Sequence, residues 1–338
     1  MDKEYFLDKN ILVKVEDLCT YFYTDDGIVR AVDGVDIEIK EGRVLGIIGE
    51  TGCGKSMLAL SIMRLVPPPG RIVRGKIFYK QDNENVIDLV KLHPMGDTIR
   101  DIRGKHISMI FQEPMVSLNP IYTIGDQIIE NIMIHQNMTK KDAREYAIHM
   151  LEQVGIPEPA KRIDDYPHQL SGGMRQRAMI AMALSCNPKL LIADEPTTAL
   201  DVTVQAQVLD LLKNLQQKIG MAIMIITHNL GVIAEIADSV AVMYLGKVME
   251  YASLNDLFDR PLHPYTQALL RSIPSLAIQG GTKKRLEVIK GDIPDPYSII
   301  EGCSFASRCP NFMELCRKDP PLVELENGHK VRCWMYSK

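Results

Sequence analysis

The chain has 338 residues, of which 46% are hydrophobic and 24% are charged, a composition typical of a globular protein of about two domains. Its net charge of -4 lacks the basic excess of nucleic-acid-binding proteins, so nucleic acid is not expected as a partner. No apolar stretch approaches the ~20 residues that span a bilayer, and residues 1–6 lack a signal-peptide pattern. We therefore expect a soluble, cytosolic chain that reaches a membrane only through protein partners.

Strand patterns dominate the first third of the chain, and a helical segment follows from about residue 121 to 186. The early strands are expected at residues 12–15, 35–39, 44–48, 75–79 and 107–111. Later strands alternate with helices, and these strands are expected at residues 190–193, 222–226, 239–244 and 247–251. This order predicts an α/β fold with a sheet covered on both faces and a helical insertion.

A glycine-rich loop follows the apolar strand at 44–48 and precedes an apolar segment, 57–65, that is expected to be helical. The loop consists of Gly49, Glu50, Thr51, Gly52, Cys53, Gly54, Lys55 and Ser56. This spacing of two glycines before Lys-Ser is the pattern of a phosphate loop, and the strand–loop–helix context disfavours a chance glycine turn. The loop amides bind phosphates, Lys55 pairs with the β- and γ-phosphates, and the Ser56 hydroxyl holds Mg²⁺. The loop predicts binding of ATP and Mg²⁺.

Two carboxylates end the apolar strand at 190–193. Asp194 is a candidate ligand of Mg²⁺ or its water shell, and Glu195 is a candidate to orient and polarise an attacking water. Without other evidence, such a pair is more simply an acidic strand end that faces solvent. Together with the upstream phosphate loop, the pair favours ATP hydrolysis.

Further segments resemble the motifs of ATP-binding cassette (ABC) ATPases. Residues 170–177 (Leu-Ser-Gly-Gly-Met-Arg-Gln-Arg) resemble the signature motif, and residues 111–114 (Phe-Gln-Glu-Pro) resemble the Q-loop. Residues 198–201 (Thr-Ala-Leu-Asp) resemble the D-loop, and residues 227–228 (Thr-His) resemble the switch histidine. The resemblance covers about residues 11–275. It implies a phosphate-loop NTPase of the ABC type, with a RecA-like core sheet, an antiparallel β subdomain and a helical subdomain.

The same resemblance implies that two cassettes pack head to tail and share their nucleotides. Ser171, Gly172 and Gly173 then open a helix whose amides bind the γ-phosphate held by the partner cassette. Asp201 then works across the interface between the two cassettes.

Other residues are implied to serve the nucleotide bound by this chain. Gln112 reaches Mg²⁺ and the attacking water and signals to the membrane subunits, and His228 contacts the γ-phosphate. Phe22 fits the aromatic residue that stacks on adenine, with its neighbours Tyr21 and Tyr23 as alternatives.

Four of the seven cysteines lie in the last 36 residues: Cys303, Cys309, Cys316 and Cys333. In a cytosolic chain, such a group is more typical of a metal site than of disulfides. Four thiolates suit either Zn²⁺ or an iron–sulfur cluster, and the spacing does not choose between them. Four unrelated structural cysteines are the remaining alternative.

A narrower resemblance concerns the end of the chain. Residues 261–266, 291–296, 302–305 and 308–310 resemble the C-terminal extension of dipeptide and oligopeptide permease ATPases. His329 and residues 333–334 (Cys-Trp) fit its end. The predicted organisation is an ABC ATPase domain, 1–260, with the helical subdomain (about 121–186) inserted, and a small Cys-rich extension, 261–338. The resemblance implies a [4Fe–4S] cluster on the four cysteines, with Zn²⁺ as the alternative.

The expected function is the ATP-hydrolysing motor of a bacterial ABC importer for dipeptides or oligopeptides, peripheral on the cytoplasmic face of the membrane. The implied partners are a second ABC ATPase chain, identical or paralogous, two membrane permease subunits and, indirectly, an extracytoplasmic binding protein. A nickel importer belongs to the same subfamily and is an alternative. A soluble ABC ATPase outside transport is another, and a phosphate-loop kinase or GTPase leaves the signature motif unexplained.

Overall fold

The computed structural model describes residues 10–112, 117–198, 200–272, 289, 291–298 and 300–337. Residues 1–6, Glu113 and Pro114 of the expected Q-loop, and Ala199 of the expected D-loop lie outside the described residues. The chain forms two compact units, each assembled from separate stretches of sequence. The first unit draws on residues 1–12, 39–44 and 80–226, and the second on residues 13–38, 45–79 and 227–338.

The first unit contains three parallel strands in the order β8-β7-β6. They are β6 (Ile107–Ile110), β7 (Leu190–Asp194) and β8 (Ala222–Ile226). Every residue of β7 and β8 is buried, as expected for parallel strands that are covered on both faces. Both strands read as continuous apolar runs for that reason. A short strand, β5 (Val86–Asp88), also belongs to this unit.

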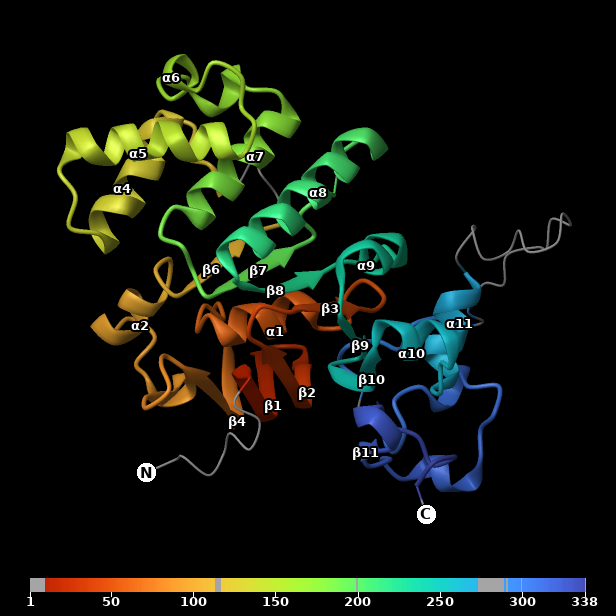
Figure 1. Cartoon of the computed structure of the whole chain (residues 1–338). Helices are drawn as coiled ribbons and strands as arrows, with labels where there is room; N and C mark the ends of the chain where they lie inside the picture. Colours follow the sequence, from red (N-terminus) through yellow and green to blue (C-terminus); the bar gives the residue numbers. More distant parts are fainter. Residues whose placement is uncertain are drawn as a thin grey trace, which may run out of the picture. The chain divides into compact units, whose positions relative to one another are not determined.

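Helices make up most of the remaining first unit. In Figure 1, α4 (Ile124–His135), α5 (Lys140–Gln153) and α7 (Gly172–Leu184) pack on one another. Helix α4 begins at Thr123, which forms a capping box with Asp126 and satisfies the first amides of the helix. Its isoleucines repeat at helical spacing on the buried face. The other helices are α2 (Asp97–Ile102), α6 (Pro159–Arg162) and α8 (Val202–Ile219).

The second unit contains two sheets. The antiparallel sheet has the order β2-β1-β4, formed by β1 (Ile11–Thr24), β2 (Gly27–Lys40) and β4 (Gly70–Lys80). In the other sheet, β3 (Val44–Ile48) runs parallel to β9 (Ser239–Tyr244), and β10 (Lys247–Ser253) pairs antiparallel with β9. The C-terminal strands continue this sheet, since β12 (Lys330–Val331) pairs with β10 and β11 (Val323–Glu324) pairs with β12.

The helices of the second unit are α1 (Lys55–Ile62), α9 (Leu230–Ile236), α10 (Leu254–Asp259) and α11 (Pro264–Arg271). Helices α10 and α11 pack against β10. Beyond them the C-terminal segment forms single 3₁₀ turns at Ala306–Arg308, Glu314–Arg317 and Glu326–Gly328. No helix among the described residues is long and apolar enough to cross a bilayer.

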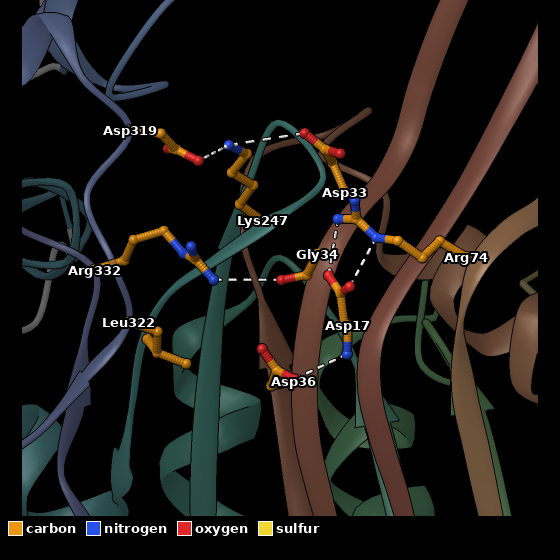
Figure 2. Close-up of a pocket in the computed structure, with 9 residues that line it drawn as sticks. All are labelled: Asp17, Asp33, Gly34, Asp36, Arg74, Lys247, Asp319, Leu322 and Arg332. Atoms are coloured by element: carbon orange, nitrogen blue, oxygen red, sulfur yellow. Dashed lines mark hydrogen bonds and ion pairs between the residues drawn. The ribbon is translucent and has the colours of Figure 1, made fainter.

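Ion pairs tie the C-terminal segment to the antiparallel sheet around a polar cavity of about 310 Å³ (Figure 2). The Lys247 ammonium lies 2.6 Å from the Asp319 carboxylate and 3.7 Å from that of Asp33. Arg332 donates a hydrogen bond of 3.3 Å to the carbonyl of Gly34. Residues separated by almost 300 positions therefore meet within one compact unit.

Candidate functional site

The phosphate loop joins the buried strand β3 to helix α1, as the sequence predicts. Three of its glycines have positive φ angles, and at two of them the surroundings also exclude a side chain. A Cβ at Gly49 would collide with the Met243 carbonyl, and one at Gly54 with the Ala31 carbonyl. Gly54 is the N-cap residue of α1, so the loop ends at the free amides of a helix N-terminus. The local backbone is that of an anion-binding loop.

Lys55 points into this loop. Its ammonium is buried and donates hydrogen bonds to the carbonyls of Gly49, at 2.8 Å, and Glu50, at 3.0 Å. The Cys53 thiol lies 3.8 Å from the same nitrogen, and burial raises the pKa of that thiol. The positive charge of Lys55 is thus held inside the loop by two backbone carbonyls.

A cavity of about 330 Å³ lies beside the start of the loop. Its walls include Gly49, Glu50 and Thr51, together with His228. The Thr227 amide donates to the Ile47 carbonyl at 3.2 Å, which fixes the backbone before His228 next to β3. The structure therefore brings the expected switch histidine and the phosphate loop to one cavity.

The acidic end of β7 forms a second cluster, in the first unit. Asp194 is buried, and Glu195 follows it with a φ of 48°, a left-handed conformation that costs a residue other than glycine about 1 kcal/mol or more. The Glu195 carboxylate accepts hydrogen bonds from the side-chain amide of Gln112 at 3.2 Å and from the Thr198 hydroxyl at 2.8 Å. The structure thus joins two residues that the sequence nominated separately, and adds Thr198.

The expected signature and D-loop residues begin helices. Ser171 is the N-cap of α7, and its hydroxyl accepts from the Met174 amide at 3.3 Å. Asp201 is the N-cap of α8 and accepts from the Val204 amide at 2.9 Å. Gly172 is exposed, and a Cβ there would meet no atom of the described residues within 4 Å. The start of α7 at Ser171 and Gly172 is therefore exposed.

The three neighbouring aromatic residues of β1 lie in different surroundings. The Phe22 ring lies against Gly70. Thr20, two residues earlier, is on the same face of the strand, and its hydroxyl forms a hydrogen bond of 2.8 Å with the Ser61 hydroxyl of α1. Tyr21 instead donates to Asp33 at 2.6 Å, and Arg71 lies 4.3 Å above the ring of Tyr23. Only Phe22, of these three, shares the strand face that bonds the helix following the phosphate loop.

The four C-terminal cysteines lie close enough to affect one another's charge. The thiols of Cys303, Cys316 and Cys333 are buried and that of Cys309 is half-buried. The pKa of Cys303 is raised to about 11, chiefly by burial, and the other three thiols act in the same direction. No group of three or more His, Cys, Asp or Glu side chains within the described ranges is arranged to hold a metal ion. The metal site expected at the four cysteines is therefore not found among the described residues.

Arg308 and Tyr265 contact the phosphate loop although sequence reasoning does not indicate this, and both lie in segments that carry the narrower resemblance. Arg308 pairs with Glu50 of the phosphate loop at 2.7 Å, and the Tyr265 hydroxyl accepts from the Glu50 amide at 3.0 Å. Their partners are more than 200 residues away along the chain, so no local pattern indicates them.

Two family models match the chain. The model described as ABC transporter matches residues 32–198, and the model described as oligopeptide/dipeptide transporter, C-terminal region, matches residues 249–316. Several curated relatives match almost end to end. The oligopeptide transport ATP-binding protein AppD of Bacillus subtilis is 50% identical over 97% of this chain and 97% of its own length. The dipeptide transport ATP-binding protein DppD of Escherichia coli is 47% identical over 95% of this chain and 96% of its own.

Solved structures agree with the fold. A dimeric post-hydrolysis structure of the ATP-binding cassette MJ0796 bound to ADP and Pi matches with a TM-score of 0.64 and 27% identity, covering 72% of this chain and 99% of that one. CbiO1 of Clostridium perfringens, part of the ABC transporter complex cbiONQ, matches with a TM-score of 0.61 and covers 75% of this chain and 92% of that one. The predicted ABC ATPase fold is confirmed. The chain belongs to the ATP-binding proteins of ABC transporters, in the group with the oligopeptide/dipeptide transporter C-terminal region.

Proposed function

We propose that the chain is the ATP-binding and ATP-hydrolysing motor subunit of an importer of dipeptides or oligopeptides. The observation that carries this proposal is the bonding of Glu195 to Gln112 and Thr198, in a chain that also holds an intact phosphate loop. The relatives named above are oligopeptide and dipeptide transport proteins, which favours peptides over nickel as the transported molecule.

Glu195 is the proposed group that orients and polarises the attacking water. Two neutral donors hold its carboxylate, so the side chain stays an acceptor and keeps one orientation. Gln112 touches this carboxylate directly, so movement of the Q-loop displaces the base. This contact gives a physical route by which membrane subunits and hydrolysis influence one another.

Lys55 and the loop amides bind the phosphates of ATP in this proposal, His228 contacts the γ-phosphate, and Phe22 stacks on adenine. Ser56, Asp194 and Gln112 are the proposed holders of Mg²⁺. Their hydroxyl, carboxylate and amide oxygens suit a hard cation. Magnesium, when bound, neutralises the charge that develops on the β- and γ-phosphates.

The working unit proposed here is a dimer, with an identical or a paralogous chain. Ser171, Gly172 and Gly173 form a helix start that is exposed at its first two residues and suited to an anion, and they serve a nucleotide held by the partner. Asp201 lies at the start of the neighbouring helix α8, where Val202 is 82% exposed. The similarity to a dimeric cassette bound to ADP and Pi supports this arrangement.

Two membrane permease subunits are the remaining proposed partners, with a binding protein outside the membrane acting indirectly. Ile121 and Tyr122 are 72% and 52% exposed and follow the Q-loop segment closely in sequence. Large exposed apolar side chains of this kind favour a protein contact. The location that we propose for the chain is the cytoplasmic face of the membrane, as a peripheral subunit.

Replacement of Glu195 by glutamine tests the catalytic proposal. The Glu195→Gln variant should bind ATP as the unaltered chain does but lose hydrolysis by about 10²-fold or more, because the amide cannot accept a proton from water. Phosphate release by the assembled transporter and nucleotide binding measure the two effects. Glu130→Gln, which changes an exposed glutamate of α4, is the matched control and should hydrolyse normally. Undiminished hydrolysis by Glu195→Gln would remove the proposed base.

We also propose that Cys303, Cys309, Cys316 and Cys333 hold a [4Fe–4S] cluster. Four thiolates on one Zn²⁺ lie about 2.3 Å from the ion, whereas in a cluster each binds its own iron and the sulfurs stand farther apart. The four thiols lie close enough to affect one another's charge, which suits either arrangement, and the resemblance of this segment to the C-terminal extension of peptide permease ATPases supports the cluster. The cluster, when bound, keeps the four cysteines deprotonated and cross-links their segments.

Metal analysis of the full-length protein purified without oxygen tests this proposal. Iron and sulfide should each approach four per chain, the content of one [4Fe–4S] cluster. Cys309→Ser should lower both, while Cys186→Ser, which changes a buried cysteine in the first unit, should leave them unchanged. Stoichiometric zinc without iron would reverse the assignment.

A further inference from the structure

Glu50, the second residue of the phosphate loop, has all of its polar groups engaged. Its carboxylate accepts two hydrogen bonds from the Arg308 guanidinium, at 2.7 and 3.1 Å. Its amide donates to the Tyr265 hydroxyl at 3.0 Å, and its carbonyl accepts from Lys55 at 3.0 Å. Arg308 and Tyr265 both belong to the C-terminal part of the chain. The conformation of Glu50 therefore depends on residues more than 200 positions away.

The Arg308 side chain is buried and bonded on more than one side. It is only 4% exposed, and it also donates to the Tyr244 hydroxyl at 3.2 Å. The rings of Tyr244, Tyr265 and Phe305 pack on one another, with centroids 4.7 to 5.3 Å apart. The two parallel bonds of a guanidinium to a carboxylate fix direction as well as distance. The contact with Tyr244, which packs in an aromatic cluster, thus orients the Arg308 guanidinium toward Glu50.

The charge of Glu50 makes this pairing important for a nucleotide. Its side chain is 22% exposed, and Glu50 lines the same cavity as Gly49, Thr51 and His228. An unpaired carboxylate at this position would repel a triphosphate, and the repulsion is strong at short range in a partly desolvated site. A buried cation against Glu50 removes that repulsion.

We propose that Arg308 is a positioning residue for ATP binding: it neutralises Glu50 and, with Tyr265, holds the first residues of the phosphate loop in place. The inference rests on the proposed ATPase function. It adds that the C-terminal part of the chain contributes directly to nucleotide affinity. Arg308 acts through Glu50, without touching the nucleotide.

A double-mutant cycle on the full-length chain tests this role, with the dissociation constant of a fluorescent ATP analogue in Mg²⁺ as the readout. Arg308→Met should weaken binding about tenfold or more, because it leaves an unpaired carboxylate beside the phosphates. Glu50→Gln should weaken binding less. The double variant should bind better than Arg308→Met alone, because the repelling charge is gone. Arg308→Lys keeps the charge without the paired bonds and should lie between Arg308→Met and the unaltered chain.

Arg317→Met is the matched control, because Arg317 also adjoins a clustered cysteine but is 71% exposed and pairs only with Glu314 among the ion pairs described. It should bind the analogue normally. Equal affinity of Arg308→Met and the unaltered chain would overturn the inference, as would a double variant as weak as Arg308→Met. Where Arg308→Met does not fold, Arg308→Lys decides by the same comparison. Failure of the unaltered chain to bind nucleotide would instead overturn the proposed function.

Discussion

His263 illustrates how a single buried ring sets the protonation state of its surroundings. The ring is 1% exposed, and its Nδ1 accepts a hydrogen bond from the Tyr265 amide at 3.0 Å. Burial lowers the pKa of His263 to about 4, although the nearby Glu250 carboxylate acts in the opposite direction. Glu250 itself accepts from the His263 amide at 2.9 Å and from His329 at 2.7 Å. The ring is therefore neutral in the folded chain at neutral pH.

This state predicts acid sensitivity. The pKa of His263 is near 6.5 in the unfolded chain and about 4 in the folded chain. Between these pH values the unfolded chain binds a proton that the folded chain does not, so lowering the pH favours unfolding. The loss is on the order of 3 kcal/mol when both pKa values have been passed. His263→Asn, which keeps an acceptor at the start of α11, should flatten the pH dependence of urea unfolding between pH 6.5 and 4. His149→Asn, at an exposed position, should not, and equal curves for both variants would contradict the assignment.

At the level of single residues, the sequence was informative where chemistry follows a local pattern. Lys55 and Glu195 were nominated because a loop and a strand end mark their positions. The bonds from Thr198 to Glu195 and from Arg308 to Glu50 were not foreseen. Threonine and arginine are frequent surface residues, and only the folded chain shows which carboxylate each one meets.

At the level of elements, the N-terminus of helix α7, which carries the signature segment, has room for a larger side chain at one of its glycines. Gly172 does not have a positive φ angle, and a Cβ there would meet nothing within 4 Å. Its neighbour Gly173 is closer to other atoms, since a Cβ there would lie 3.0 Å from Val204. No contact with the described part of the chain requires glycine at position 172.

Gly172→Ala should therefore separate stability from activity. The free energy of unfolding should stay constant or rise by up to ~1 kcal/mol, because alanine is the better helix former. Hydrolysis by the assembled transporter should fall about tenfold or more, because the methyl group would occupy space needed by the partner's γ-phosphate at the helix amides. Chemical denaturation and phosphate release measure the two effects. Full activity in this variant would argue against a shared nucleotide site.

Strand β1 shows why element boundaries were harder to predict than element types. The alternation predicts a strand at residues 12–15, but the strand continues to Thr24. Its register with β4 shifts after Glu16, where Asp17 takes a φ of 46°, and Leu18, Cys19 and Thr20 are buried in succession. Gly75 on the partner strand leaves room for this irregularity, because a Cβ there would lie 2.5 Å from the Asp17 carbonyl. A bulge interrupts the period of two on which the prediction depends.

At the level of the whole molecule, the order of strands and helices followed from hydrophobic periodicity, whereas the composition of the compact units did not. Each unit combines stretches that are far apart in sequence. The division at residue 260 stays a prediction, and the segments on either side of it are bonded within the second unit. Strand β12 pairs with β10, and Glu250 accepts hydrogen bonds from Leu262 and His263. Long-range pairings of this kind have no local signature.

The contact between Glu50 and Arg308 also limits how such transport proteins can be recombined. The two side chains form one ion pair, yet they are separated by 258 positions. A chimera that takes its C-terminal segment from a relative inherits one member of the pair and retains the other. Position 50 therefore has to be exchanged together with position 308. The residue at position 308 of the grafted segment then keeps the partner that it has in the relative.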